Sequence, residues 1–427
     1  MASDSIDLVG GPFAVLESDP GVFTILLRKL GLQHLEVIEL YSVEPWATAH
    51  LERDIRGLIL CYPCPADSPR DGAAMDFDEE SADPDAKDVW FAHQLSVDAC
   101  ASQTILNVCM NLDGVAMSPA LREFYEDTLR MDPLMKGLAF TNCAFIREAH
   151  NTMARPADIR AAEHALAKTT SEYTKTLKAN SGRPAAKRRK LSSPKKKQSA
   201  SDAEDLEDTF HYIGYVPAHR HVWELDGLRA GGPLDVGALP QASGHLGWID
   251  IVRPALQRKM QGVQGAADGR CSLLAVVGDR YEAASDALEL LKRARTTLER
   301  RLGEVHPAGW HDKADAGLVH GVDAAFETSL QSAAPGRTFA RDFGARKMEQ
   351  DMRILDMPER SLVGAWETCI RDAREANRAV EDEIATAKRA HTEHISRTHD
   401  YDEFLRTFIT CMHKEGHLDS ALIPKNT

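Results

Sequence analysis

The sequence has no long apolar segment and no regular spacing of cysteines. None of its 427 residues belongs to an apolar run of 18 or more, so we expect no membrane-spanning helix and no membrane partner. The start of the chain, Met1 to Leu8, lacks the basic and apolar stretches of a secretory signal, so none is predicted. The eight cysteines are scattered, which favours a reducing compartment over a disulfide-stabilised secreted fold.

Motifs for phosphate or metal binding are also scarce. The sequence holds no Gly-rich phosphate motif of the Walker or Rossmann type. Cys61 and Cys64 have the spacing of half a zinc site, but no second Cys or His pair stands in register with them. His391, His394 and His399 are more typical of a charged helix face than of a metal site. We therefore expect neither a metal nor an organic cofactor.

Helical and strand-like patterns alternate over the first 280 residues. Asp19-Pro20 supplies a helix cap before a helical pattern, and Gly57-Leu-Ile-Leu-Cys-Tyr is typical of a buried strand. Further helices are predicted at 119–128, 248–260 and 282–301, and further strands at 36–41, 209–216, 222–225 and 273–277. This order indicates an α+β domain over 1–280, a helix and linker over 281–357, and a helical block over 358–427.

Two loops of opposite charge interrupt the α+β domain. Residues 63–88 are rich in Asp, Glu and Pro, and we interpret them as an acidic loop. Residues 156–208 form a longer insert, in which a helix at 157–177 precedes a basic stretch that is too polar to fold by itself. The net charge of −14 argues against general coating of nucleic acid and suits a basic protein partner.

Cys100 stands where a helix is predicted to begin. The residues that follow place Ala101, Ile105 and Val108 on one helical face. The positive end of a helix dipole favours the thiolate, which is the nucleophilic form of cysteine. A small buried apolar residue is the ordinary alternative for an intracellular cysteine, and Cys100 alone does not decide between the two.

His211 and Asp226 lie on the two arms of a predicted hairpin. A tight turn at Ala218 and His219 would place His211 directly opposite Asp226, close enough for the carboxylate to orient the imidazole. The hairpin alone is equally compatible with a structural His–Asp pair. Gln94, six residues before Cys100, carries an amide that can donate to an oxyanion beside the Cys100 N–H. The order Gln94, Cys100, His211, Asp226 is typical of a papain-type thiol hydrolase.

These segments resemble the ubiquitin carboxyl-terminal hydrolase family of cysteine deubiquitinases, over about residues 12 to 280. The resemblance rests on eight stretches: Leu16-Glu-Ser-Asp-Pro-Gly-Val-Phe, Gly57-Leu-Ile-Leu, Phe91-Ala-His-Gln-Leu, Asp98-Ala-Cys-Ala-Ser-Gln, Ala149-His-Asn with Ala154-Arg-Pro, Phe210-His-Tyr-Ile-Gly-Tyr-Val-Pro, Glu224-Leu-Asp-Gly-Leu and Trp248-Ile-Asp-Ile-Val-Arg-Pro.

The resemblance implies a papain-like, knotted fold with a central antiparallel sheet flanked by helices. It also implies ubiquitin and ubiquitinated proteins as ligands, Cys100 as nucleophile, His211 as general base and acid, Asp226 as the residue that orients it, and Gln94 as oxyanion donor. Asp98 departs from the asparagine that the family often has two residues before its cysteine. This departure motivates an alternative, a catalytically idle ubiquitin-binding scaffold.

The end of the sequence extends the resemblance. The stretch from His399 to Leu418 is similar to the helical extension of long family members, with an apolar stripe of Phe404, Leu405, Phe408, Ile409 and Met412. The stripe packs either against the tail's own helices or against an activating partner. Long members associate with the proteasome or with chromatin. The stretches Tyr401-Asp-Glu-Phe and Phe91-Ala-His-Gln-Leu, with the basic insert, slightly favour the chromatin-associated kind.

The basic insert has two interpretations. In this family the insert crosses over the active site, so its length here implies that bulky conjugates are not excluded. Its cluster of seven bases is typical of a nuclear-import signal, from which we expect a nuclear and cytoplasmic protein. The alternative is weak docking onto DNA or a nucleosome. The bases are Lys187, Arg188, Arg189, Lys190, Lys195, Lys196 and Lys197.

Overall fold

A computed structural model describes residues 11–48, 55–64, 84–181, 209–240, 247–264, 271–329 and 339–417. The chain forms two compact units. The first contains residues 1–33, 37–276 and 393–427, and the second contains residues 34–36 and 277–392. The predicted boundaries at 280 and 357 stay a prediction. The basic cluster at 187–197 and most of the acidic loop lie outside the described residues.

The first unit is built on a six-stranded sheet with the order β2-β8-β3-β5-β6-β7. The pairs β3/β5, β5/β6 and β6/β7 are antiparallel. The strands are β2 Leu35–Leu40, β3 Ile55–Cys64, β5 Thr209–Ala218, β6 His221–Asp226, β7 Leu234–Ala238 and β8 Ser272–Gly278. A short second sheet pairs β1, Leu32–Gln33, with β4, Ala116–Met117. The predicted strands are confirmed, whereas β7 was not predicted.

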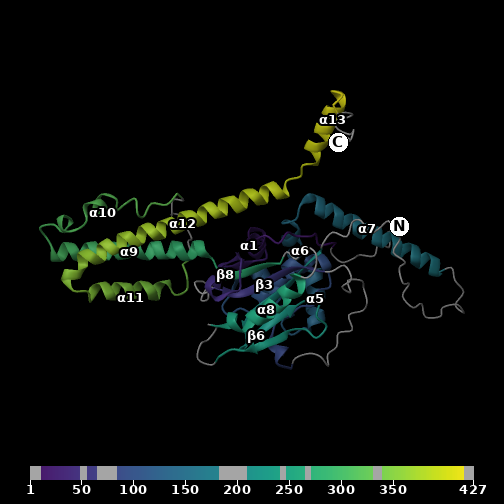
Figure 1. Cartoon of the computed structure of the whole chain (residues 1–427), viewed down its shortest axis with the longest axis horizontal. Helices are drawn as coiled ribbons and strands as arrows, with labels where there is room; N and C mark the ends of the chain where they lie inside the picture. The colour runs from purple at the N-terminus through teal and green to yellow at the C-terminus, as the bar shows by residue number, and fades with distance from the viewer. Residues whose placement is uncertain are drawn as a thin grey trace. The chain divides into compact units, whose positions relative to one another are not determined.

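Helices cover this sheet (Figure 1). The helix α3 packs against β3, β5 and β6, and α8 packs against β3, β6 and β7. Asp19 caps α1 by accepting from the Val22 N–H, as its position before Pro20 predicts. The helices are α1 Pro20–Lys29, α2 Pro45–Thr48, α3 Cys100–Cys109, α4 Pro119–Thr128, α5 Pro133–Asn142, α6 Ala144–Asn151, α7 Pro156–Ser181 and α8 Trp248–Gln264. The predicted α+β class with a helical C-terminal region is confirmed.

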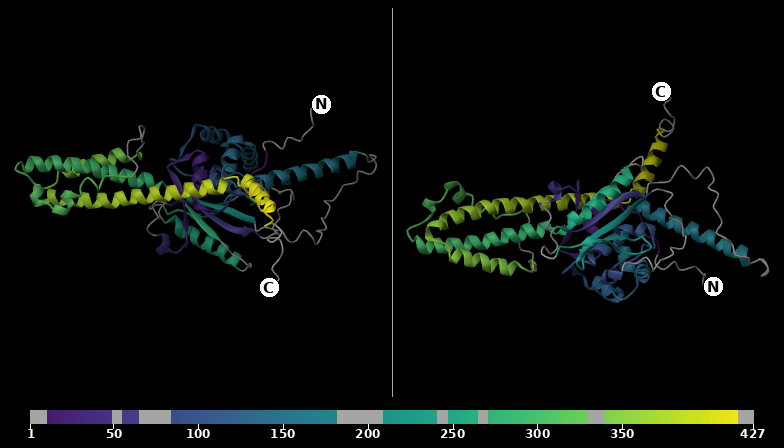
Figure 2. Two further views of the ribbon diagram at one scale, coloured as in Figure 1. Left: turned by 90° about the horizontal axis from the view of Figure 1, so that it is seen from above. Right: turned by 60° about the horizontal axis from the view of Figure 1, so that its bottom comes forward.

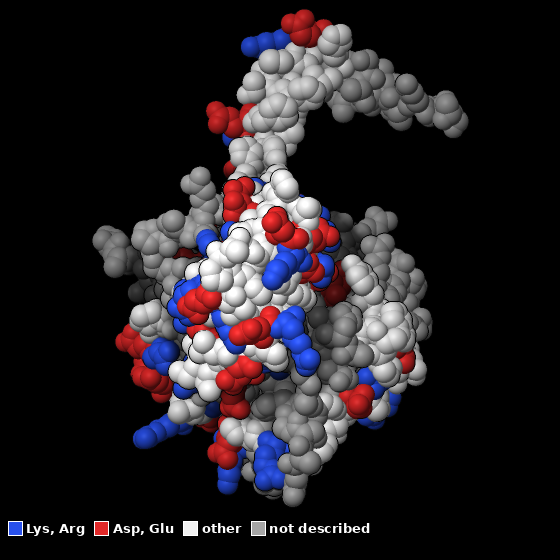
Figure 3. Space-filling view, turned by 90° about the vertical axis from the view of Figure 1, so that its left-hand side faces the viewer, with Lys and Arg blue, Asp and Glu red and all other residues white. Residues whose placement is uncertain are grey.

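The second unit is helical. Its helices α9 Arg280–Val305, α11 Phe343–Leu355 and α12 Leu362–Thr398 run side by side (Figure 2), with the short α10 Ala316–His320 between α9 and α11 in sequence. Leu298, Leu302, Trp310, Trp366 and Ile370 belong to its buried core. Basic and acidic side chains are interspersed on the outer face (Figure 3), many of them paired along one helix, as in Arg293–Glu289 and Arg371–Glu367.

Candidate active site

Cys100 is the first residue of α3, as its sequence context predicts. A short 3₁₀ turn, Val97–Ala99, leads into the helix. The residues from Ala101 to Cys109 are all buried, whereas Cys100 is only half-buried.

Two glycines allow α3 to approach the sheet closely. A Cβ atom at Gly57 on β3 or at Gly214 on β5 would lie 2.4 Å or 2.5 Å from a Val108 methyl group. One turn earlier, the Thr104 hydroxyl donates to the Tyr212 carbonyl over 3.4 Å. Cys100 lies one further turn toward the start of the helix, on the same face. This progression directs Cys100 toward the part of β5 that carries His211.

The electrostatics of Tyr212 agree with this placement. Burial raises the pKa of Tyr212 well above its ordinary value, and negative charge on the Cys61 and Cys100 thiols would raise it further. Cys61 faces Tyr212 across the β3/β5 pair. Cys100 and Cys61 therefore lie near the residue that directly follows His211.

His211 and Asp226 form a hydrogen-bonded pair at the end of the hairpin. The His211 Nε2 atom lies 2.8 Å from Asp226 Oδ1, which also accepts from the Leu228 N–H over 3.0 Å. Burial alone would raise the pKa of Asp226, but the hydrogen bond and charge of His211 and the Leu228 N–H together hold it below its ordinary value. A carboxylate therefore orients the ring, and Nδ1 is the ring nitrogen available to exchange a proton with a thiol.

The predicted register of this hairpin is wrong. The turn residues are His219 and Arg220, with φ of 51° and 67°, instead of Ala218 and His219. Asp226 consequently pairs with Ile213 and not with His211. His211 lies two residues before Ile213 and so projects from the same face of the sheet, which keeps it within reach of Asp226 along the diagonal.

Gln94 is buried beside the turn that follows Asp226. Its backbone N–H donates to the Gly227 carbonyl over 2.8 Å. A Cβ atom at position 227 would lie only 2.8 Å from the Gln94 Cβ, so glycine is required there for this close approach. The structure thus brings Gln94 next to the end of the hairpin that carries Asp226. Gly227 is a site residue that the resemblance included only as part of a motif.

Burial has the largest effect on the pKa of the Cys100 thiol. It raises the pKa of Cys100 well above its ordinary value, and the charges of Cys61 and Asp98 would raise it further. The N–H groups of Ala101 and Cys100 lower the pKa, as expected at a helix start, but the effect of burial is larger. The helix N–H groups thus act on the Cys100 pKa in the predicted direction, and burial opposes them with the larger effect.

Three amide side chains hold the segment that leads to Gln94, two of them on α3 and one, Asn111, in the turn just after it, and none was predicted from the sequence. Gln103 and Asn107 bond the backbone of Ala92, and Asn111 bonds the backbone of Trp90. Their common signal is an amide residue at every fourth position from Gln103 to Asn111. The prediction for this helix considered only its apolar face.

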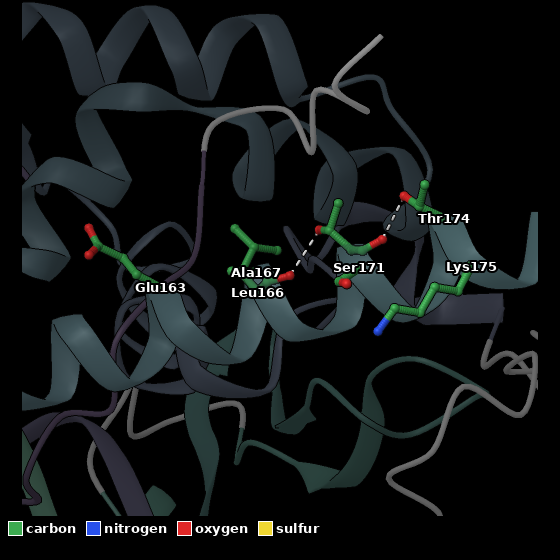
Figure 4. A pocket seen from close by; sticks show the side chains of 7 residues that line it. Glu163, Leu166, Ala167, Ser171, Thr174 and Lys175 are labelled. Carbon is green, nitrogen blue, oxygen red and sulfur yellow. Dashed lines mark hydrogen bonds between the residues drawn. The ribbon is translucent and has the colours of Figure 1, made fainter. Parts of the chain in front are cut away.

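A hollow on α7 is distinct from these residues (Figure 4). Its alcohols bond within their own helix, since Thr170 donates to the Leu166 carbonyl and Thr174 to the Thr170 carbonyl. No converging set of polar groups is therefore directed into it from the residues that line it. Among the described residues, no cluster of three or more His, Cys, Asp or Glu is arranged to hold a metal, and no helix is long and apolar enough to span a membrane.

The sequence model of ubiquitin carboxyl-terminal hydrolase family 1 (Peptidase_C12) matches residues 13–261. The chain belongs to this family. A second model, UCH_C of the ubiquitin carboxyl-terminal hydrolases, matches residues 373–418. The chain is therefore a ubiquitin carboxyl-terminal hydrolase, a cysteine-type deubiquitinase, and the family predicted from the motifs is confirmed.

Relatives of this hydrolase include both short and long proteins. Isozyme L5 of Dictyostelium discoideum is 27% identical over 306 residues, which are 71% of this chain and 74% of that protein. The Caenorhabditis elegans hydrolase ubh-4 is 28% identical over 70% of this chain and 77% of its own length. The hydrolase BAP1 of Danio rerio is 29% identical over 68% of this chain, but the match spans 34% of BAP1.

Solved structures of Trichinella spiralis UCH37 bound to ubiquitin vinyl methyl ester are also similar. The catalytic domain is 26% identical and covers 64% of this chain and 98% of that chain, with a TM-score of 0.43. The longer form is 23% identical and covers 81% of this chain and 100% of that chain, also with a TM-score of 0.43.

Proposed function

We propose that this hydrolase cleaves the bond at the C-terminal glycine of ubiquitin with Cys100 as nucleophile, His211 as general base and acid, Asp226 as the residue that orients His211, and Gln94 as oxyanion donor. The observation that carries the proposal is the His211–Asp226 hydrogen bond of 2.8 Å, at the end of the strand against which the Cys100 helix packs. The bond cleaved is a peptide, isopeptide or ester bond.

In the proposed reaction the thiol starts protonated, and burial, which raises the Cys100 pKa, acts in that direction. His211 accepts the Sγ proton at Nδ1, and the Asp226 carboxylate stabilises the imidazolium that forms. The thiolate adds to the carbonyl carbon, and the oxyanion accepts hydrogen bonds from the Gln94 amide and the Cys100 N–H. His211 then protonates the leaving amine, which leaves a thioester at Cys100.

Water completes the cycle. His211, neutral again after protonating the amine, removes a proton from a water molecule that attacks the thioester. The second tetrahedral intermediate collapses and releases ubiquitin, whose new carboxyl group loses its proton to solvent, while His211 returns the proton it took from the water to Cys100 Sγ. Each step uses groups of this chain and water.

A ubiquitin probe with a C-terminal electrophile tests the proposal against the idle scaffold. The scaffold draws support from Asp98, whose charge raises the Cys100 pKa, so that the thiol is harder to ionise. We expect wild-type enzyme to form a covalent adduct that mass spectrometry locates at Cys100. Reversible binding of ubiquitin without an adduct would support the scaffold instead, and an adduct at another cysteine would overturn the site.

We propose that the C-terminal helix α13, Asp402–Lys414, binds an activating protein of a proteasome or chromatin complex. Its apolar stripe is exposed, with 63% of Phe404, 47% of Leu405, 51% of Phe408 and 50% of Ile409 accessible. Within the first unit, Arg160 on α7 contacts Asp400 and Asp402 before and at the start of α13, over 3.3 Å and 3.1 Å. This exposure favours the partner interpretation of the stripe over packing within the chain.

Phe404→Arg or Phe408→Arg is expected to abolish stimulation by the natural partner. The basal rate on a fluorogenic ubiquitin C-terminal amide should stay within about twofold, because both rings are exposed and neither belongs to the proposed catalytic residues. Thr407→Arg adds the same charge to the same helix off the stripe and serves as the control, which should retain stimulation. A fall in thermal stability with Phe404→Arg alone would contradict the partner interpretation.

The basic residues of the insert support a further part of the proposal. We place the protein in both nucleus and cytoplasm, because clusters of this kind are read by the import machinery without being folded. The bulk of the insert beyond α7 lies outside the described residues. Docking of the seven bases onto DNA or a nucleosome is the alternative use of the same charge.

A further inference from the structure

The segment from Trp90 to Leu95 belongs to no strand in the described structure, and it contains Gln94, the proposed oxyanion donor. Buried backbone groups need hydrogen-bond partners, and a segment outside a sheet must find them elsewhere. Here the partners at Trp90 and Ala92 are amide side chains on α3 and just beyond its end. The N–H groups of His93 and Gln94 donate instead to the carbonyls of Pro133 and Gly227.

The hydrogen bonds at each held residue of this segment form one set, which we call a rung. At Trp90, the N–H donates to Asn111 Oδ1 over 2.7 Å, and the carbonyl accepts from Asn111 Nδ2 over 2.8 Å. At Ala92, the N–H donates to Asn107 Oδ1 over 2.9 Å, and the carbonyl accepts from Asn107 Nδ2 over 3.2 Å and from Gln103 Nε2 over 2.7 Å. At Gln94, the N–H donates to the Gly227 carbonyl.

The spacing of the amide residues matches the spacing of the residues whose backbone they hold. Four residues of an α-helix rise about 6.0 Å, and two residues of an extended chain rise about 6.6 Å. Amides spaced four apart on a helix can therefore replace the backbone of a neighbouring strand. The order of the rungs also shows that the segment runs antiparallel to α3, so its next step brings Gln94 toward the start of the helix, where Cys100 lies.

We propose that Asn107 and Gln103 are positioning residues for catalysis. They hold the backbone of Ala92 and thereby fix the position of Gln94 relative to the start of α3. The inference rests on the proposed role of Gln94 as oxyanion donor. Asn107 is 1% exposed, so water cannot readily replace its amide when the side chain is shortened. A displacement of the donor on the order of 1 Å is enough to weaken transition-state stabilisation strongly.

Two variants remove the rung at Ala92 in different ways. Asn107→Ala deletes a donor and an acceptor and is expected to lower both stability and kcat. Gln103→Met deletes only the donor to the Ala92 carbonyl. It also removes Gln103 Oε1, which is buried with no hydrogen-bond partner among the described residues, so stability should change little. Gln103→Met therefore separates positioning from folding, and remains informative if Asn107→Ala folds poorly.

Asn111→Ala is the matched control. It removes the equivalent pair of amide–backbone hydrogen bonds at Trp90, four residues from Gln94 instead of two, together with the bond from Asn111 Nδ2 to the Asn107 carbonyl just beyond the end of α3. The assay measures kcat and KM of the full chain on a fluorogenic ubiquitin C-terminal amide. Thermal unfolding of every variant supplies the stability that a purely structural role would follow.

We expect Asn107→Ala to lower kcat about tenfold or more and Gln103→Met about threefold, with KM within about twofold in both. Asn111→Ala should lower kcat less than Asn107→Ala, even at equal loss of stability. In a Gln94→Ala background, Asn107→Ala should no longer change kcat, although it should still lower stability. Hydrogen exchange at the Ala92 amide should accelerate in Asn107→Ala.

Two results would overturn this inference but leave the proposed role of Gln94 intact. One is an equal fall of kcat in Asn107→Ala whether or not Gln94 is present, and the other is a kcat that follows stability across all three variants. A wild-type kcat in Gln94→Ala itself would instead remove the proposed role of Gln94, and this inference with it. The single and double variants therefore distinguish the two failures.

Discussion

Cys100→Ser is expected to abolish hydrolysis of ubiquitin conjugates while leaving ubiquitin binding nearly unchanged. The substitution keeps the shape of the residue at the start of α3 but replaces the thiol with an alcohol that His211 cannot ionise to a useful extent. We expect kcat on a fluorogenic ubiquitin C-terminal amide to fall by a factor on the order of 10⁴ or more. Titration calorimetry with free ubiquitin should give a dissociation constant close to that of the wild type.

Cys143→Ser is the matched control for this experiment. Cys143 is also half-buried and also stands at the start of a helix, as the N-cap of α6, where it makes no side-chain capping bond. Serine is a good N-cap, so this variant should be stable and fully active. Substantial turnover by Cys100→Ser, or an equal loss in Cys143→Ser, would refute the assignment of the nucleophile.

His211→Ala should be almost as damaging, because it removes the group that takes the proton from a thiol whose pKa is raised by burial. We expect kcat to fall by about 10³-fold or more, with a smaller effect on KM. Asp226→Asn keeps the ring but exchanges the carboxylate for an amide, so its loss should be equal or milder. The measurement is steady-state kinetics over a range of pH.

The same hairpin supplies a control for the histidine. His221 Nδ1 pairs with Asp235 over 2.8 Å, the same distance as the His211–Asp226 pair, and both of these side chains are half-buried. His221→Ala removes an imidazole–carboxylate pair from the sheet without touching the thiol, so it should leave kcat near the wild-type value. If the two alanine variants lost activity equally, the His211–Asp226 pair would be a structural feature of the hairpin.

Local signals explain which parts of the fold were predictable. Asp19-Pro20 names the start of α1, and the short strands around His211 and Asp226 follow from their alternation and apolar content. The register of that hairpin was not predictable, because its turn residues His219 and Arg220 both have positive φ, which Asn and Gly signal far more often. The observed register of the hairpin differs from the predicted one by two residues, and such a shift leaves each side chain on the same face of the sheet. His211 and Asp226 therefore still lie within hydrogen-bond distance.

The pKa of Cys100 and the hydrogen bonds that position Gln94 could not be predicted from the sequence, for a different reason. Both depend on burial, which arises from segments that are far apart in the chain. The helix start at Cys100 is visible in the sequence, but the desolvation that outweighs the helix N–H groups appears only when β3 and β5 pack against α3. Likewise, Asn107 looks like an ordinary polar helix residue until Ala92 lies beside it.

The glycines that face α3 and Gln94 bear on how natural variants of this gene product should be interpreted. Gly57, Gly214 and Gly227 carry no functional group, yet a methyl group at any of them would meet Val108 or Gln94 at less than 3 Å. An alanine there would displace α3 or Gln94 without removing either. In a survey of tolerated substitutions, these three positions should therefore be as intolerant as Cys100 and His211.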